Sequence, residues 1–491
     1  MERSSGVLLH ISSLPGEGGI GSMGKEAFRF VDFLVATRQK IWQILPLGPV
    51  GFGNSPYQCY SAFAGNPLFI DIDLLVNDRL LDKKLVENLQ FKTSRVEFDK
   101  VEDWKMNLFR QAFAAFRKNL SRYSAEYHDF MNHNAWWLND YALFRALKSA
   151  NNETVWNTWP EELVRREKAT IDKVSGELHE EIDFHCFLQF LFFRQWFGLK
   201  SYAHSKGIQI IGDIPLYVSL DSVDVWANQE IFMLDDKARP TKVGGVPPDY
   251  FSETGQLWGN PVFDWERVAS RNFDWWLARL HFNLRMFDLV RIDHFRGLES
   301  FWAINAGEET AVVGEWLPAK GHELFSRLKE HLGKLNVIAE DLGIITPEVA
   351  QLRDDFGLPG MKVLQFAYGS DATNENLPHN YSANFLVYTG THDNDTSLGW
   401  FNSIGKKEKR LLHKYVAGSG KQFVRNFMEE AWRSAAFMAI VPMQDVLGLD
   451  TDARMNTPGV PSGNWGWRFS WSQLRSNHKV FLKKITEKYN R

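Results

Sequence analysis

Residues 289–297 read LVRIDHFRG, a short apolar run that ends at Asp293. A run of apolar, partly β-branched residues that stops at a polar cluster is typical of a buried parallel strand. Arg291 and Asp293 lie two residues apart, so both side chains project from the same face of this strand. The run therefore predicts a buried strand that delivers a cation and a carboxylate toward its C-terminal end.

Seven other runs of this kind recur along the chain. They span residues 7–12, 41–45, 208–213, 335–340, 363–367, 385–388 and 437–441. Helical periods lie between most of them, and one is well delimited: Thr346 is an N-cap candidate, Pro347 takes the first helical position and Gly357 suits a left-handed C-terminal residue. Eight strands alternating with helices predict a (β/α)₈ barrel, with an open doubly wound sheet as the alternative.

Two long stretches interrupt this alternation. Residues 68–205 separate the second strand from the third, which is far more chain than one crossover helix requires. Apolar residues recur there at helical spacing, so we expect a mostly helical insertion. Residues 219–271 are rich in Pro, Gly, Asp and Trp, and we expect a loop-rich insertion after the third strand. Residues 1–491 are otherwise expected to form one barrel domain.

Composition excludes several classes of protein. The 491 residues include 56 Lys and Arg against 60 Asp and Glu, and no long basic run, so nucleic acid is not an expected partner. The apolar run in the N-terminal MERSSGVLLHISSLP is too short for a signal peptide, and no apolar stretch reaches the roughly 20 residues that span a bilayer. Two cysteines, Cys59 and Cys186, allow at most one disulfide and fit a reducing cytoplasm.

Carboxylates stand at or just beyond the ends of four predicted strands: Asp213, Asp293, Glu340 and Asp393. In a closed barrel they converge at one end, where like charges repel, although any one of them could simply cap the following helix. Arg291 would keep Asp293 ionised, whereas Glu340, among apolar neighbours and other carboxylates, is the candidate for a raised proton affinity. Such a pair is the machinery of retaining glycosidic-bond cleavage.

Two histidines accompany these carboxylates. Asp393, within the run THDNDT, could hold sugar hydroxyls, and His294 and His392 are natural hydrogen-bond donors, although a single histidine is more often structural. The same carboxylates with His392 could instead bind Zn²⁺ or Mn²⁺ at a barrel mouth. No His-x-His pair follows the first strand, no HExxH motif occurs, and THDNDT lacks the glycine and closing glutamate of a calcium loop. We therefore expect neither a metal nor a cofactor.

Aromatic residues lie on two expected loops, 51–67 and 244–261. They are Tyr57 and Tyr60 in the first loop, and Tyr250, Phe251 and Trp258 in the second. Rings on loops can stack on sugar faces or fill the rim of a barrel, and composition favours neither interpretation.

Eight ordered motifs are similar to those of the 4-α-glucanotransferases known as amylomaltase or disproportionating enzyme, in the α-amylase superfamily. They are HISSLPG (10–16), SPYQCYSAFAGNP (55–67), GDIPLYV (212–218), PPDYFSETGQLWGNP (247–261), RIDHFRG (291–297), AEDLG (339–343), GTHDNDT (390–396) and MNTPGVPSGNWGWR (455–468). The resemblance covers essentially the whole chain. Asp213 is followed by Ile-Pro-Leu-Tyr-Val rather than by the Asn-His pair of many α-amylases, which favours a transferase.

Position by position, the resemblance implies that Asp293 is the nucleophile, Glu340 the general acid and base, and Asp393 the transition-state stabiliser. It also implies substrate-binding roles for ten residues: Tyr57, Asp213, Asp249, Phe251, Gln256, Trp258, Arg291, His294, His392 and Asn464. The family further implies a barrel with inserted subdomains and no C-terminal β-sandwich.

The resemblance thus predicts a cytoplasmic 4-α-glucanotransferase. It would move α-1,4-glucan segments from a donor to the 4-hydroxyl of an acceptor glucan or glucose through a covalent glycosyl-enzyme. The expected partners are maltooligosaccharides, starch or glycogen, and the expected state is a monomer or weak homo-oligomer. Two alternatives stay open: an amylase-like α-1,4-glucan hydrolase and a glucan-binding barrel without activity. The first stays open because the exclusion of water from the site decides whether water or a sugar acts as the acceptor.

Overall fold

The computed structural model describes residues 2–87, 90–248 and 252–491, and its centre is an eight-stranded parallel sheet. The strands, in sheet order, are β10 (Gly360–Val363), β11 (Phe385–Tyr388), β12 (Met438–Pro442), β1 (Ser4–Leu8), β2 (Ile41–Gln43), β3 (Gln209–Pro215), β6 (Leu289–Asp293) and β9 (Val337–Ala339). The Ala339 N–H donates to the Pro359 carbonyl at 2.9 Å, immediately before β10. The two ends of the sheet therefore meet, and the predicted (β/α)₈ barrel is confirmed.

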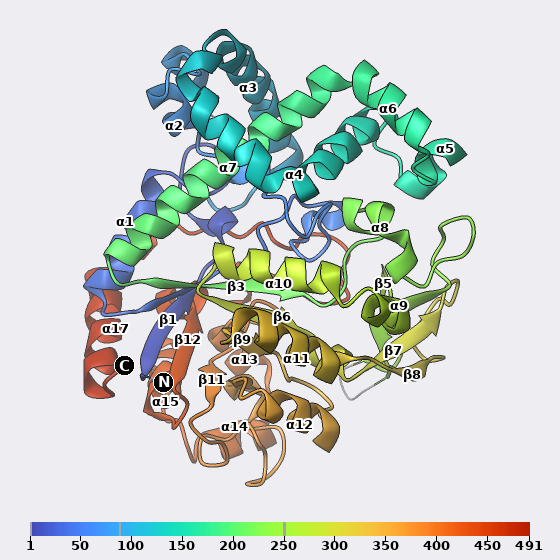
Figure 1. Ribbon diagram of the computed structural model, residues 1–491. Helices are drawn as coiled ribbons and strands as arrows, with labels where there is room; N and C mark the ends of the chain where they lie inside the picture. Colours follow the sequence, from blue (N-terminus) through green and yellow to red (C-terminus); the bar gives the residue numbers. More distant parts are fainter. Residues whose placement is uncertain (1, 88–89, 249–251) are drawn as a thin grey trace.

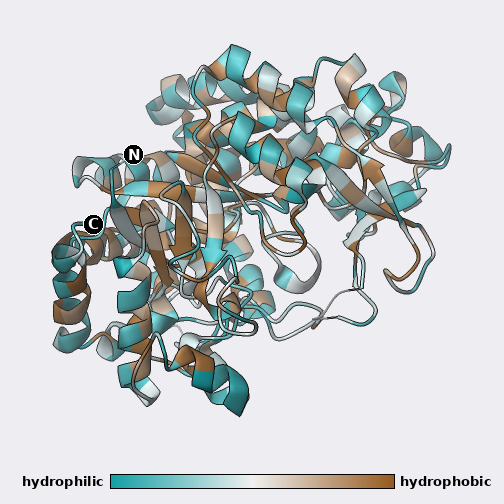
Figure 2. Cartoon of the chain, turned by 90° about the horizontal axis from the view of Figure 1, so that it is seen from below, coloured by the Kyte–Doolittle hydropathy of each residue, from teal (hydrophilic) through white to brown (hydrophobic). Residues whose placement is uncertain are grey.

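Helices cover the outside of this barrel (Figure 1). They include α1 (Lys25–Ala36), α10 (Asp274–Met286), α11 (Gly321–Leu332), α12 (Pro347–Asp355), α13 (Ser397–Ser403), α14 (Lys406–Leu412), α15 (Gly420–Arg433), α16 (Met443–Leu447) and α17 (Ser476–Lys488). The predicted delimiters of α12 are confirmed, since Thr346 is the N-cap residue and Gly357 has a φ of 62°. Figure 2 shows hydrophobic residues concentrated on the strands and hydrophilic ones on the outer faces of the helices.

Two strands are displaced by three or more residues from the predicted runs. The first strand spans Ser4–Leu8 rather than residues 7–12, and a 3₁₀ turn over Ile11–Ser13 follows it. The sixth spans Gly360–Val363 rather than residues 363–367, because the Val363 N–H donates to the Asn376 side chain and a 3₁₀ turn begins at the next residue. Apolar residues continue through both turns because these turns are buried, so hydropathy alone does not locate where the strands end.

The chain between β2 and β3 is mostly helical. It contains α2 (Ile72–Asn77), α3 (Phe98–Lys118), α4 (Leu120–Ala150), α5 (Glu161–Val164), α6 (Lys168–Glu177) and α7 (His179–Ser205), which lie together above the barrel in Figure 1. The buried ammonium of Lys148 on α4 lies 2.7 Å from Asp221, which follows β3. This ion pair ties the helical layer to the loops at the C-terminal end of the barrel. None of the helices in the three described segments is long and apolar enough to cross a membrane.

A second sheet was not anticipated from the sequence. It has four antiparallel strands in the order β5 (Gln256–Pro261), β4 (Lys242–Val246), β7 (Ser300–Asn305) and β8 (Glu315–Pro318). The stretch 219–271 also contains the short helices α8 (Val223–Ala227) and α9 (Trp265–Ser270). The sequence does not predict β4 because this strand contains Gly244 and Gly245, and glycine has a low strand propensity. A side chain at Gly244 would overlap the ring of Tyr217, so close packing requires glycine there.

Two glycine-to-alanine substitutions should change the free energy of unfolding in opposite directions. A Cβ at Gly212 on β3 would overlap the buried ring of Phe287, so we expect Gly212→Ala to destabilise the protein by about 1–3 kcal/mol. Gly198 on α7 is exposed with open space around it, and Gly198→Ala should stabilise by about 0.5–1 kcal/mol. Denaturant unfolding measures both, and equal shifts in the two variants would contradict the packing argument.

Candidate active site

The guanidinium of Arg291 joins two carboxylates at the end of the barrel. Its Nη1 donates to both oxygens of Asp213 at 2.8 Å, and its Nη2 lies 2.8 Å from Oδ1 of Asp293. The Arg291 and Asp213 side chains are 4% and 0% exposed, whereas that of Asp293 is 29% exposed. Only Asp293 of this trio is therefore available to a ligand in the open end of the barrel.

Strand geometry explains why these side chains meet. Asp213 and Arg291 are direct partners in the parallel pairing of β3 with β6, so their side chains lie on the same face. Asp293 follows two residues after Arg291 on that face. The next residue, His294, has left-handed φ and ψ of 55° and 48°, which is uncommon outside glycine and turns the chain sharply out of the strand.

Glu340 follows directly after β9 and is linked to β6 through this turn. The backbone N–H of His294 donates to Glu340 Oε2 at 2.7 Å. Burial raises the pKa of Glu340 well above its ordinary value; Asp293 and Asp341 act in the same direction, and Arg291 and the His294 N–H oppose them. Glu340 is thus suited to hold a proton beside a charged carboxylate, which is the protonation state that a general acid requires.

Asp393 lies in the loop after β11 and has two side-chain partners. His392 Nε2 lies 3.2 Å from its Oδ2, and Asn456 Nδ2 donates to its Oδ1 at 2.6 Å. Burial alone would raise the pKa of Asp393, but His392, Asn456 and Arg291 outweigh it and bring the pKa down to about 2. Conversely, although burial disfavours charged His392, Asp393 raises the histidine's pKa. Asp393 is therefore an anion at neutral pH.

Tyr57 reaches the same centre from the loop after β2. Its hydroxyl donates to Asp213 Oδ2 at 2.8 Å. Its ring stacks on His392 with centroids 5.2 Å apart and planes 15° from parallel, and Trp465 lies 5.8 Å from Tyr57 and 5.9 Å from His392. Segments far apart in the sequence thus form one aromatic and charged wall.

Trp258 and Gln256 project from β5 toward this centre. The Trp258 indole lies edge-on to His294 with centroids 4.8 Å apart, and its N–H donates to Gln256 Oε1 at 3.1 Å. Burial lowers the pKa of His294 to about 4, so its imidazole is neutral. Its Nε2 is buried and has no hydrogen-bond partner among the described residues. The neutral imidazole therefore has one buried ring nitrogen whose hydrogen-bonding capacity is not used by these residues.

Other residues singled out in the sequence have different surroundings. The Asn464 side chain accepts from the Thr457 N–H at 3.0 Å and donates to the Val460 carbonyl at 2.8 Å. Both hydrogen bonds stabilise the loop of residues 457–464, to which Asn464 itself belongs. Asp249 and Phe251, together with Tyr250, lie outside the described residues. The structure adds Asn456 and Trp465, which sequence reasoning missed, although both belong to the quoted motif MNTPGVPSGNWGWR.

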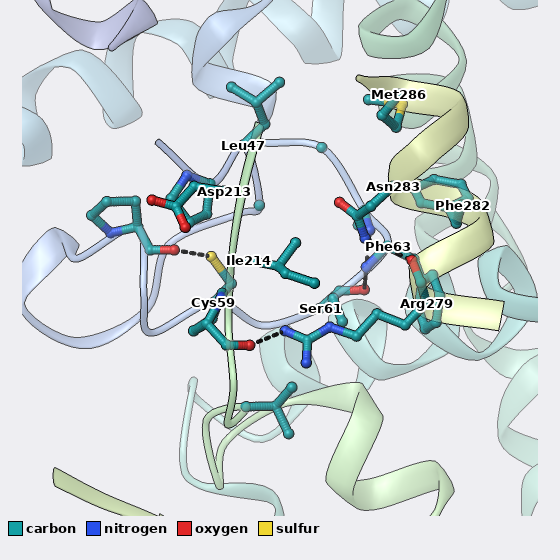
Figure 3. A pocket seen from close by; sticks show the side chains of 18 of the residues that line it. Leu47, Cys59, Ser61, Phe63, Asp213, Ile214, Arg279, Phe282, Asn283 and Met286 are labelled. Atoms are coloured by element: carbon teal, nitrogen blue, oxygen red, sulfur yellow. Dashed lines mark hydrogen bonds between the residues drawn. The ribbon is translucent and has the colours of Figure 1, made fainter. Parts of the chain in front are cut away.

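A small cavity, with Tyr57 and Asp213 among its lining residues, lies between the loop after β2 and α10 (Figure 3). Its lining is mainly apolar and includes Ile214, Phe282 and Met286. Its volume of about 60 Å³ is enough to hold water molecules. No group of three potential metal ligands is found within residues 2–87, 90–248 and 252–491.

Comparison with known proteins gives a consistent result. Residues 9–474 match the family model described as 4-alpha-glucanotransferase. The 4-alpha-glucanotransferase of Synechocystis is 48% identical over 496 residues, which cover 100% of this chain and 98% of that protein. That of Thermus thermophilus is 48% identical over 497 residues, covering 99% of each. An amylomaltase from Streptococcus agalactiae, solved in complex with acarbose, superposes with a TM-score of 0.97 at 41% identity over the full length of both chains.

The match therefore includes every barrel strand except β1, and it contains Arg291 and all three carboxylates of the open site. Relatives that share nearly half of their residues along the whole length leave no large segment of this chain unmatched. The chain belongs to the 4-alpha-glucanotransferase family.

Proposed function

We propose that this chain transfers α-1,4-glucan segments from a donor to the 4-hydroxyl of an acceptor glucan or glucose, with net retention at the anomeric carbon. Family membership identifies the chain as a 4-α-glucanotransferase. The observation that best supports the retaining mechanism is the opposite character of two neighbouring carboxyl groups. Asp293 is paired with the guanidinium of Arg291, whereas the raised pKa of Glu340 favours its protonated form.

In the first step, an oxygen of Asp293 attacks the anomeric carbon of the donor. The glycosidic C–O bond breaks as Glu340 gives its proton to the departing oxygen, and the leaving segment is released. In the second step, Glu340 takes the proton of the acceptor's 4-hydroxyl. That oxygen attacks the same carbon and displaces Asp293, so that two inversions give net retention.

Asp393 is proposed to hold the hydroxyls of the reacting sugar and to stabilise the positive charge that develops on it. Its ionised state and its exposure of 40% support this role. Arg291 and Asp213 would position Asp293, while His294 and His392 would donate or accept hydrogen bonds at the sugar ring.

Substrate is proposed to run along a groove lined by Tyr57, Gln256 and Trp258, together with Asp249, Phe251 and Asn464. In this proposal residues 1–491 form one catalytic barrel, with 68–205 as a helical insertion and 219–271 as the rim of the groove. The edge-on contact of Trp258 with His294 supports the assignment of residues 219–271 to the rim, because it brings β5 against the proposed catalytic site. The substrates would be maltooligosaccharides, starch or glycogen.

We further propose that the protein acts in the cytoplasm as a monomer or weak homo-oligomer. Cys59 and Cys186 are both free, which suits a reducing compartment.

Purified protein incubated with maltotriose and a chelator should produce glucose together with a ladder of longer maltooligosaccharides, resolved by chain length. Transfer of a maltosyl unit to a second maltotriose gives maltopentaose, whereas water as acceptor gives only glucose and maltose. Glucose and maltose alone would identify a hydrolase. Loss of the ladder on adding the chelator, with recovery by a divalent cation, would contradict the proposed two-carboxylate chemistry.

Replacing the two proposed catalytic carboxylates should separate their roles. Asp293→Ala should abolish measurable transfer from both maltotriose and α-maltosyl fluoride, because no nucleophile remains. Glu340→Gln should lower transfer from maltotriose by about 10²–10⁴-fold, yet still release fluoride from α-maltosyl fluoride in its first turnover, because this leaving group needs no proton. Glu308→Gln, in an exposed turn, is the matched control and should be unaffected. An equal loss in the first-turnover release of glucose from maltotriose and of fluoride from α-maltosyl fluoride would refute the assignment of Glu340.

The pH profile should report the protonation of Glu340. Since its pKa is raised and its protonated form acts first, kcat/KM for maltotriose should fall as pH rises through that pKa. The alkaline fall should be absent when fluoride release from α-maltosyl fluoride is measured. An identical alkaline fall with the two donors would assign it to another group.

A further inference from the structure

We propose that Asn456 is a positioning residue for the reaction: its side-chain amide, supported by Arg454, fixes the orientation in which Asp393 acts on the sugar. The inference rests on the role of Asp393 in the proposed function.

Two short segments, 454–456 and 392–393, are joined by three hydrogen bonds, and a fourth lies within the first segment. The Asn456 N–H donates to the His392 carbonyl at 3.1 Å, and Asn456 Nδ2 donates to Asp393 Oδ1 at 2.6 Å. Arg454 donates through Nη2 to the Asp393 carbonyl at 2.5 Å and through Nε to the Asn456 carbonyl at 2.7 Å. Backbone and side chain of Asp393 are therefore both held by the same segment.

The two oxygens of Asp393 have partners of different character. Oδ2 lies beside His392, which titrates, whereas Oδ1 accepts from the amide of Asn456, which carries no charge at any pH. Asn456 can thus fix the rotation of the carboxylate without competing for its proton. Without this amide, the Asp393 side chain, which is 40% exposed, would keep only its contact with His392 to restrain the rotation of its carboxylate.

Titratable groups from several neighbouring strands and loops also act on this pair. They include Arg291 and Asp213 from β6 and β3, His10 after β1 and Tyr57 from the loop after β2. Asn456 is the neutral donor to the Asp393 carboxylate. Its removal should therefore alter orientation with little change in the net charge of the site.

The segment itself does not depend on the amide of Asn456. Trp465 N–H donates to the Met455 carbonyl at 2.8 Å, and the buried Met455 sulfur accepts from the Ser13 hydroxyl at 3.8 Å. The backbone N–H of Asn456 and the Arg454 guanidinium also stay in place when only the side-chain amide is changed. Variants of Asn456 should consequently fold.

The first test compares Asn456→Ala with Asn402→Ala. Asn402 also donates to a carboxylate nearby, Asp450 at 3.2 Å, but this pair does not include Asp393. With maltotriose as donor and acceptor, Asn456→Ala should lower kcat by about 10- to 100-fold with a much smaller change in KM, because the oriented carboxylate matters most in the transition state. Asn402→Ala should have the kcat and KM of the wild-type protein. The melting temperatures of both variants should lie close to that of the wild-type protein.

The second test uses Asn456→Asp, which keeps the shape and replaces the donor by a carboxyl group. A second carboxylate against Asp393 Oδ1 would raise the pKa of the pair. While the introduced group keeps a proton it can still donate to Asp393, but once both groups are ionised no donor remains and the two anions repel. Activity should therefore fall as pH rises through that raised pKa, in a range where the wild-type protein is still active. A loss through misfolding alone would lower the rate by the same factor at every pH.

Three results would overturn the inference: a folded Asn456→Ala with wild-type kcat, a loss confined to KM, or an Asn456→Asp profile parallel to that of the wild type. The wild-type protein distinguishes the two levels of proposal. If it does not disproportionate maltotriose, the proposed function fails; if it does and the Asn456 variants match it, only the positioning role fails.

Discussion

The site depends on one buried cation. Arg291 lies between Asp213, which is inaccessible, and Asp293, which faces the open end of the barrel. A buried guanidinium is costly unless its hydrogen bonds are satisfied, and here parallel register supplies the first carboxylate and the strand period supplies the second. Because Asp213 holds Arg291 in place, the charge facing Asp293 is fixed before any ligand arrives, which is the preorganisation that electrostatic catalysis requires.

Around this cation, the barrel shifts the pKa values of Glu340 and Asp393 in opposite directions. Glu340 receives an N–H from His294, directly after Asp293, so the strained left-handed turn at His294 couples the ends of β6 and β9. Burial raises the pKa of Glu340, while His392 and Asn456 lower that of Asp393. Glu340 and Asp393, two carboxyl groups of similar intrinsic acidity, thus acquire opposite pKa shifts from their surroundings, which is the condition for dividing acid and stabilising roles.

Much of this arrangement could be predicted from the sequence, and the omissions have physical causes. All eight strands were located, as was the shared face of Arg291 and Asp293, because both follow from local patterns. The contact of Arg291 with Asp213 depends on register between strands, which local patterns do not determine. The strand at Gly244–Gly245 was missed because packing against Tyr217, rather than propensity, selects glycine there. Asn456 was missed for a similar reason, since its target lies on another loop.

The aromatic and charged wall has a consequence for how the protein is made. Tyr57 comes from the start of the chain and Trp465 from near its end, and both pack on His392, which in turn lies against Asp393. A chain still emerging from the ribosome therefore possesses Asp293 and Glu340 long before the third carboxylate has its partners. The complete wall can form only after synthesis has passed Trp465.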